Sequence, residues 1–172
     1  MIQLSTTSVE EYTTGSSWKE RLVKSRITTK ELLQYLELES HPLASSDAEK
    51  LFELRVPFGY LNKIKKKDPL DPLLLQILPQ NQEFIDTPGY TNSPLDEADY
   101  SPVKGLIHKY ANRVLLIASS ACAINCRYCF RRTFPYENHR QSRSDWQQAL
   151  NYIRGDRDVD EVMLDGGEPL IQ

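Results

Sequence analysis

The sequence predicts an α/β protein in which a helical N-terminal region precedes the start of a parallel sheet. Three observations favour this class. Leucine-rich patterns with helix-capping residues recur through the first half of the 172-residue chain. The continuous apolar run VLLIA at residues 114–118 is typical of a strand buried on both faces of a parallel sheet. A helical pattern and a second apolar run, EVML at 161–164, follow in the order of a crossover unit.

The N-terminal region is predicted to form several short helices. Thr28 and Glu31 are spaced as a capping box, in which each side chain accepts a hydrogen bond from the other residue's backbone N–H. Ser46 and Glu49 repeat this spacing ahead of a second helix. The basic run at residues 63–67 is interpreted as a solvated helix end.

Two prolines indicate further helix starts, and a long connection follows them. Pro57 suits a first helical position, and Asp71 is predicted to cap a helix that has Pro72 at its first position. From residue 79 to about 105, Pro, Asn, Asp, Gly and Ser dominate, as is typical of a connection along the surface or beside a site. We therefore predict a helical region with this connection over 1–105, and the first β-loop-α-β part of an α/β core over 106–172.

The second region is predicted to contain a strand, a polar loop, a helix and a second strand. Ser144 is expected to cap the helix, with Gln147 in the capping-box position, and Gly155-Asp156 to end it. The inner face of this helix is predicted to consist of Trp146, Ala149, Leu150 and Ile153. One such unit cannot close a barrel, and the chain stops soon after the second strand, so we expect the front part of a larger fold.

Composition and charge exclude several classes of protein. The net charge of −3 argues against a nucleic-acid or membrane-surface partner, and no apolar run approaches the roughly 20 residues that cross a bilayer. The N-terminal MIQLSTTSVEEYTTG has neither the basic nor the apolar segment of a secretory signal. We therefore expect a cytoplasmic protein, in which clustered cysteines favour metal or redox chemistry over disulfides.

All three cysteines of the chain lie within eight residues, at Cys122, Cys126 and Cys129. They could be an accidental group of thiols. They could also bind zinc, which needs four ligands and would have only His139 nearby to complete the set. A [4Fe–4S] cluster usually takes four cysteines, so three would leave one iron without a protein ligand. An open coordination position is typical of a catalytic site, and the loop follows a buried strand, where α/β folds build their active sites.

The cysteine loop also carries a family resemblance. The spacing Cys-x₃-Cys-x₂-Cys, with the aromatic Tyr128 before the last cysteine, resembles the signature of the radical S-adenosylmethionine (SAM) superfamily. The stretch RVLLIASSACAINCRYCFRRTFPY at 113–136 resembles the lysine 2,3-aminomutases, in particular the branch that makes (R)-β-lysine for modifying elongation factor P. DGGEPL at 165–170 is similar to that family's SGGDPL, and LRVP and DPLDPLLLQILP fit the same branch. The resemblance implies a radical SAM partial (β/α) TIM-like barrel, of which this chain would be the N-terminal half, truncated after its second strand.

The resemblance implies an isomerase with three cofactors. Cys122, Cys126 and Cys129 would ligate the [4Fe–4S] cluster, and the amino and carboxylate groups of SAM would chelate the fourth iron. Cleavage of SAM would give a 5′-deoxyadenosyl radical that takes a hydrogen from the β-carbon of L-lysine. Pyridoxal phosphate (PLP), held as an aldimine to the substrate, would let the amino group migrate from C2 to C3.

The resemblance also assigns individual residues. Gly166, Gly167 and Glu168 match the turn that receives the amino group of SAM, although Glu168 replaces Asp and Asp165 replaces Ser. Tyr128 resembles the residue whose region cradles adenine. Three residues ahead of the first predicted strand match positions that bind the PLP phosphate: Lys109, Tyr110 and Arg113.

Arg131 matches the arginine that pairs with the carboxylate of the substrate lysine, and a planar guanidinium suits that role. Without the resemblance, Arg131 would be interpreted as a surface arginine in a basic patch with Arg127 and Arg132.

The resemblance further implies partners: a reductant such as flavodoxin or ferredoxin, and a functional link to elongation factor P and its lysine ligase. No lysine follows Lys109, so we expect the lysine that carries PLP to be absent and the isolated chain to be inactive, as a truncated protein or a fragment. Two alternatives remain open. One is another radical SAM enzyme, such as a free-lysine aminomutase or an activase; the other is a non-catalytic zinc or iron–sulfur module.

Overall fold

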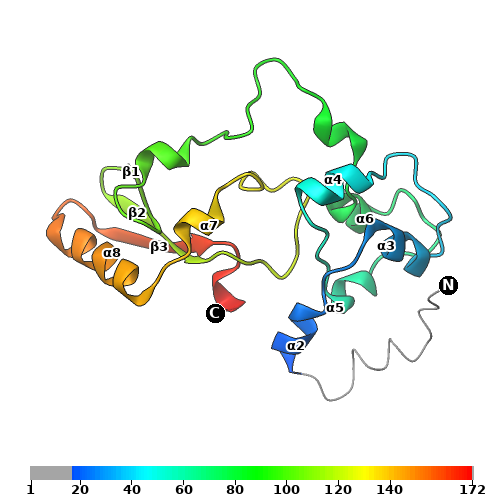
Figure 1. Cartoon of the computed structure of the whole chain (residues 1–172), viewed down its shortest axis with the longest axis horizontal. Helices are drawn as coiled ribbons and strands as arrows, with labels where there is room; N and C mark the ends of the chain where they lie inside the picture. Colours follow the sequence, from blue (N-terminus) through cyan, green and yellow to red (C-terminus); the bar gives the residue numbers. More distant parts are fainter. Residues whose placement is uncertain (1–16, 172) are drawn as a thin grey trace. The chain divides into compact units, whose positions relative to one another are not determined.

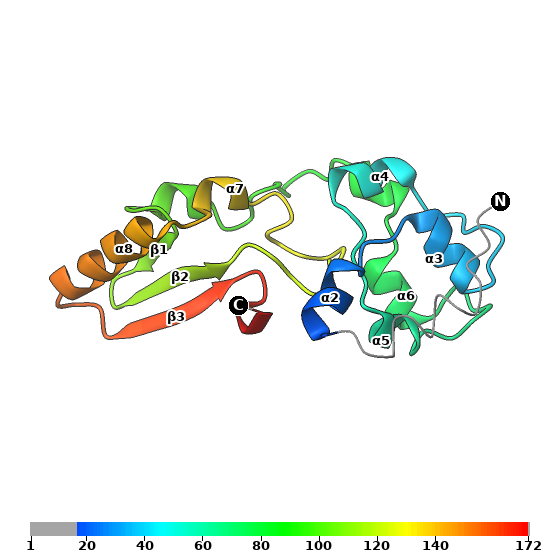
Figure 2. The same ribbon diagram turned by 60° about the horizontal axis from the view of Figure 1, so that its bottom comes forward.

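The computed structural model describes residues 17–171, which form two compact units. The first unit extends to Asp86 and also includes Ala123–Cys129. The second unit consists of Thr87–Cys122 and the chain from Phe130 onward. Figures 1 and 2 trace the chain through both units. The expectation that no secretory signal is present concerns the N-terminal segment, which lies outside the described residues.

The first unit is built from short helices around a leucine-rich core. Its elements are α2 (Trp18–Val23), α3 (Thr29–Tyr35), α4 (Ser46–Leu51), α5 (Phe58–Leu61), α6 (Pro72–Ile77) and the 3₁₀ turn η1 (Asn81–Phe84). Its fully buried side chains are mainly leucines and include Leu32, Leu36, Leu54, Leu74, Ile77 and Leu78. The lysines of the 63–67 run follow α5 and are exposed, as predicted.

Two predicted helix starts are confirmed in this unit. The Thr28 hydroxyl accepts from the Glu31 N–H, and the Glu31 carboxylate accepts from the Thr28 N–H at 2.7 Å. Asp71 caps α6 by accepting from the N–H groups of the second and third helical residues, with Pro72 at the first position. The residues of both sequence patterns therefore form the local hydrogen bonds that the patterns predict.

The other two predicted starts are each wrong by one residue. Ser45, not Ser46, caps α4 and accepts from the Ala48 N–H. Glu49 does not complete a capping box, because its carboxylate instead accepts from the Thr29 N–H at the start of α3, at 2.8 Å. Pro57 precedes α5 with extended backbone and serves as its N-cap, so this helix begins at Phe58.

The second unit is a three-stranded sheet with one long helix. Its strands are β1 (Leu106–Tyr110), β2 (Arg113–Ser119) and β3 (Glu161–Gly166), in the order β1-β2-β3. The remaining elements are η2 (Glu97–Tyr100), α7 (Tyr136–His139), α8 (Arg143–Gly155) and η3 (Pro169–Ile171). β2 and β3 are parallel, which confirms the predicted strand–loop–helix–strand order. β1 is antiparallel to β2 and was not predicted, so Lys109 and Tyr110 lie within a strand.

α8 covers the sheet through a small apolar core (Figures 1 and 2). Ala149 of α8 is fully buried with Leu106 of β1 and with Val114 and Leu116 of β2. Trp146 and Ile153 pack against this core as predicted, whereas Leu150 is 37% exposed, so its assignment to the inner face was wrong.

The start of α8 also differs from the prediction. Ser142 and Asp145 form its capping box, in place of Ser144 and Gln147. Both pairs have the required spacing, and the first one prevails because the backbone is already helical at Ser144. Within residues 17–171 no helix is long and apolar enough to cross a membrane.

Candidate functional site

The cysteine loop contains a tight turn. The Cys129 N–H donates to the Cys126 carbonyl at 3.1 Å, which closes a four-residue turn with the two cysteines at its ends. Cys122, Cys126 and Cys129 are all half-buried, and none of them is in a disulfide. Cys126 and Cys129 belong to the first unit, and Cys122 to the second.

Two residues of the loop are bonded to the helical unit. The Asn125 N–H donates to the Arg55 carbonyl at 3.1 Å, and its side-chain amide donates to the Glu53 carbonyl at 3.0 Å. Arg127 is 7% exposed and donates through both Nε and Nη2 to the two carboxylate oxygens of Glu83, at 2.9 and 2.6 Å. The interpretation of Arg127 and Arg131 as parts of a surface basic patch is therefore wrong, because both guanidinium groups are buried.

Tyr128 is the exposed member of the turn, with 69% of the residue accessible. Its hydroxyl donates to Oε1 of Gln76 at 3.3 Å. A side-chain hydrogen bond with Cys126 raises the pKa of Tyr128 above its ordinary value, and nearby Cys126 and Cys129 charge adds to this effect. The phenol therefore stays protonated at neutral pH, and its ring is free to contact a ligand.

Arg131 lies in the second unit between two carboxylates. Its Nε and Nη2 donate to both oxygens of Glu97, at 2.8 and 2.7 Å, and its Nη1 donates to Asp165 at 2.8 Å. Burial alone would lower the pKa of Arg131, but the hydrogen bonds to Glu97 and Asp165 outweigh it and raise the pKa above its ordinary value. The guanidinium is 4% exposed and permanently charged.

The glycine pair at the end of β3 approaches the end of β2 closely. A Cβ atom on Gly167 would lie 2.2 Å from the Ala121 carbonyl oxygen, and one on Gly166 would lie 2.2 Å from the Ser119 carbonyl oxygen. Gly166 also has φ +121°, which disfavours any side chain. The Gly167 N–H donates to the Ser119 carbonyl at 2.8 Å, and the Glu168 N–H donates to the Ala121 carbonyl at 2.7 Å. In this structure the glycines thus allow close contact with the chain's own backbone.

The residues predicted to bind the PLP phosphate lie at the other end of β2. Tyr110 pairs with Arg113 across the β1–β2 hairpin, whereas Ser119 and Gly166 pair at the opposite end of β2. Tyr110 is 62% exposed, and the guanidinium of Arg113 donates to Glu161. Lys109 Nζ donates to the Leu95 carbonyl at 2.6 Å, two residues before Glu97. The structure therefore places Arg113 at the end of β2 opposite to Ser119 and Gly166, while the Lys109 side chain is held by the Leu95 carbonyl.

His139, the zinc candidate, is buried in the second unit. Its ring packs on Phe134 with centroids 4.7 Å apart, and its Nδ1 atom has no hydrogen-bond partner among the described residues. Burial lowers the pKa of His139, and so does the charge of Lys104. No group of three or more His, Cys, Asp or Glu side chains in residues 17–171 is arranged to hold a metal ion. The donor set itself, three thiols outside any disulfide, has the soft ligands that an iron–sulfur cluster requires.

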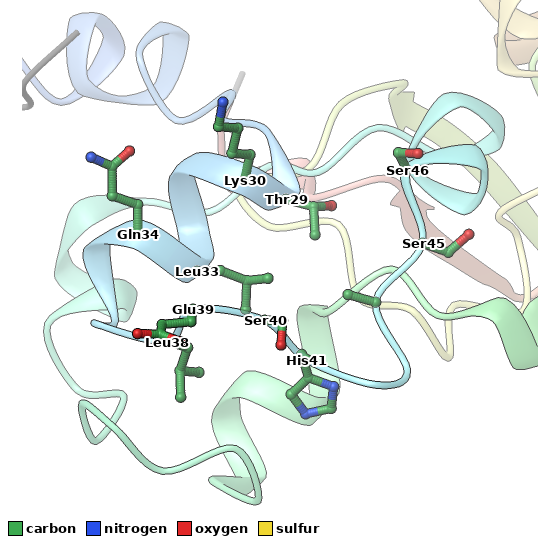
Figure 3. Close-up of a pocket in the computed structure, with 11 residues that line it drawn as sticks. Thr29, Lys30, Leu33, Gln34, Leu38, Glu39, Ser40, His41, Ser45 and Ser46 are labelled. Carbon is green, nitrogen blue, oxygen red and sulfur yellow. The ribbon is translucent and has the colours of Figure 1, made fainter. Parts of the chain in front are cut away.

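A pocket in the first unit contains none of these residues. It has a volume of about 690 Å³ and lies between α3 and the segment at residues 38–46 (Figure 3). His41 lines it, but both ring nitrogens are used: Nε2 bonds to the Pro69 carbonyl and Nδ1 accepts from the Leu43 N–H. The Thr29 hydroxyl is buried there without a hydrogen-bond partner among the described residues.

Two site residues were missed by the sequence reasoning: Glu83 and Glu97. Each neutralises a buried arginine of the cysteine loop, across 44 and 34 residues of sequence respectively. A buried arginine requires a carboxylate, but the sequence offers no local signal for which one.

Known proteins resemble this chain over most of its length. It is 42% identical over 156 residues to L-lysine 2,3-aminomutase of Escherichia coli (strain K12), a match that covers 90% of this chain and 45% of that protein. The chain is a homologue of the L-lysine 2,3-aminomutases. The enzyme of that name from Buchnera aphidicola is 43% identical over 156 residues, covering 90% of this chain and 46% of its own length. The one from Clostridium subterminale is 33% identical over 157 residues, covering 87% and 36%.

The chain thus spans less than half the length of these curated relatives. No protein-family model matches it.

Proposed function

We propose that this chain provides the cluster-binding and SAM-binding part of a radical SAM L-lysine 2,3-aminomutase, and that its sheet begins a partial (β/α) barrel. The observation that carries the proposal is the 42% identity to an enzyme of that name, together with three cysteines outside any disulfide at the radical SAM spacing. In the full proposal the enzyme converts L-lysine to (R)-β-lysine for modification of elongation factor P, in the cytoplasm. A flavodoxin or ferredoxin would supply electrons, and a lysine ligase would use the product.

The thiolates of Cys122, Cys126 and Cys129 would hold the cluster in this proposal. When bound, the cluster and SAM supply the radical that activates the substrate, and PLP supplies the group on which the amino migration occurs. The exposed ring of Tyr128, next to Cys129, offers a flat apolar surface for the adenine of SAM. The backbone of Gly166–Glu168 would contribute polar groups for the amino group of SAM, beside the carboxylate of Glu168.

Arg131 would bind the substrate carboxylate by exchanging one of its two present partners. Glu97 is 8% exposed and bonded through both oxygens, so it is the permanent partner. The Asp165 side chain is 35% exposed and holds a single N–H of Arg131, so it is the partner that a substrate carboxylate would displace. Lys109, Tyr110 and Arg113 would contribute to the phosphate site of PLP. This proposal assigns no residue of the chain to carry PLP.

Anaerobic reconstitution of the chain with iron and sulfide tests the proposal directly. We expect about four irons per chain and a visible spectrum that changes when SAM is added. The Cys126→Ala variant should lose the cluster, while an exposed control, Ser144→Ala, should keep it. Stoichiometric zinc without a response to SAM, or unchanged iron in Cys126→Ala, would show a different kind of site.

A further inference from the structure

Arg127 has an unusual position for a buried arginine, because it lies inside the turn that joins two candidate ligands. Cys126 and Cys129 occupy the first and last positions of this turn, and Arg127 occupies the second. Tyr128, at the third position, points outward and is 69% exposed, whereas Arg127 is 7% exposed. The turn therefore has one side chain in solvent and one in the helical unit.

The guanidinium of Arg127 is fully engaged by the helical unit. Besides the two bonds to Glu83, Nη1 donates to the Phe52 carbonyl at 2.6 Å and Nη2 donates to the Ala48 carbonyl at 3.0 Å. These carbonyls belong to the last turn and the C-cap of α4; the Ala48 carbonyl also accepts from the Phe52 N–H at 3.1 Å, and the Phe52 carbonyl lies beyond the helix. The Arg127 group also lies 5.1 Å from the centre of the Phe52 ring.

The backbone of the turn is bonded to the same unit on both sides of Cys126. The Arg127 N–H donates to the Gln76 carbonyl of α6 at 2.9 Å. On the other side of Cys126, Asn125 donates twice to carbonyls of the 53–55 segment, and Ile124 packs on the leucine core. Cys126 is thus bracketed by two anchored residues, although neither anchor is a metal ligand.

A buried charge is costly unless every contact is satisfied, and an apolar residue would fill the same space at lower cost. What the arginine provides and an apolar residue would not is a set of directional bonds from the guanidinium to three groups, the Glu83 carboxylate of η1 and the Ala48 and Phe52 carbonyls at the end of α4. Those bonds fix the position of the turn, and with it the backbone of Cys126 and Cys129.

We propose that Arg127 is a positioning residue that holds Cys126 and Cys129 as a preformed pair of thiols before any metal arrives. This inference rests on the proposed function for the identity of the metal group, but the preformed turn is a property of the metal-free chain. The cluster would then meet two ligands whose backbone is already ordered, so less conformational entropy is lost on binding.

Hydrogen exchange of the metal-free chain tests the preformed turn. In the wild type, the amides of Asn125, Arg127 and Cys129 should exchange slowly, because all three donate to backbone carbonyls. In Arg127→Ala they should exchange roughly two orders of magnitude faster or more, while peptides from α8 keep their protection. Arg127→Lys should fall between, since one ammonium cannot replace the fork. Arg157→Ala, which removes an exposed arginine, is the matched control and should resemble the wild type.

Electron paramagnetic resonance of the reduced, reconstituted chain tests the consequence for the cluster. Arg127→Ala should bind several-fold less iron than the wild type and give a broader or shifted signal, which Arg127→Lys partly restores. If Arg127→Ala does not fold, Glu83→Gln removes the charge partner and should show the same changes more weakly. Wild-type exchange rates and an unaltered signal in these variants would overturn the role of Arg127. A wild-type chain that takes up no iron would instead overturn the proposed function, while the exchange measurement would still decide the preformed turn.

Discussion

Arg131 and Glu97 form a buried, two-point ion pair, with Nε and Nη2 of the arginine donating to both oxygens of the glutamate. The pair joins η2 to the segment after the last cysteine, within the second unit. Removing Glu97 would leave the buried Arg131 with only its single bond to the partly exposed Asp165, and losing one partner of a buried charge is more costly than the net value of the pair.

Glu97→Ala should therefore lower the free energy of unfolding by about 3 kcal/mol or more. Denaturant unfolding monitored by circular dichroism measures this directly. Asp165→Asn is the matched variant, because its amide oxygen can still accept from Arg131 and the site is partly exposed, so the expected loss is below about 1 kcal/mol. Equal losses in the two variants would contradict the assignment of Glu97 as the permanent partner.

Gly167 should not tolerate even one added carbon. Gly167→Ala places a Cβ atom 2.2 Å from the backbone oxygen of Ala121, which accepts from the Glu168 N–H and cannot move without losing that bond. We expect a loss of about 1–3 kcal/mol, from thermal or denaturant unfolding. Gly155→Ala serves as the control, because no atom lies within 4 Å of the added carbon at the end of α8, and alanine favours the helix there. A neutral Gly167→Ala would show that the β2–β3 contact is looser than described.

The capping box of α8 gives a prediction that separates two neighbouring serines. Ser142→Ala should cost about 1 kcal/mol, because the hydroxyl that accepts from the Asp145 N–H is lost. Ser144→Ala lies inside the first turn and should change stability by less than about 0.5 kcal/mol. Urea unfolding of both variants measures the two losses. If the helix began at the later serine, the larger loss would be seen in Ser144→Ala.

His139 should make stability depend on pH between neutral and mildly acidic conditions. Burial holds the pKa of His139 below 6.5, with the charge of Lys104 acting in the same direction and that of Glu97 opposing it. The unfolded chain therefore takes up a proton at a higher pH than the folded one, and stability falls as pH decreases below about 6.5. The loss levels off once pH passes below the folded pKa.

His139→Gln removes this titration. Melting temperatures at pH 7.5 and pH 5.5 should differ less in the variant than in the wild type, since the other two histidines are common to both. An identical pH dependence would mean that His139 is protonated at the same pH in both states.

The main elements were predictable where the sequence pattern is local. Thr28–Glu31 and Asp71–Pro72 each encode a helix start through groups three residues apart or closer, and VLLIA encodes a buried strand by its continuous apolar character. β1 was not predicted because LIHKY is short and half polar, so its sequence has no clear strand pattern. It forms a strand by pairing with β2 in the hairpin. Ser142 and Ser144 offer equivalent capping patterns, and only the path of the backbone distinguishes them.

In the candidate site, too, local sequence patterns were predictable and contacts that depend on the tertiary fold were not. The cysteines were identifiable from their spacing, because metal ligands in one loop form a local pattern. The burial of Arg127 and Arg131 was not, because it depends on Glu83 and Glu97, whose approach is set by the tertiary fold. From the sequence alone, arginines in and after a cysteine motif are interpreted as a surface patch, because their distant carboxylate partners are not known.

Among the described residues β3 is an outer strand of the sheet, and three of its consecutive apolar residues, Val162, Met163 and Leu164, are between 41% and 62% exposed. An edge strand presents unpaired backbone N–H and C=O groups. When its side chains are also apolar, it tends to pair with other strands, including those of neighbouring molecules. Solubility during expression will therefore depend on what covers this strand.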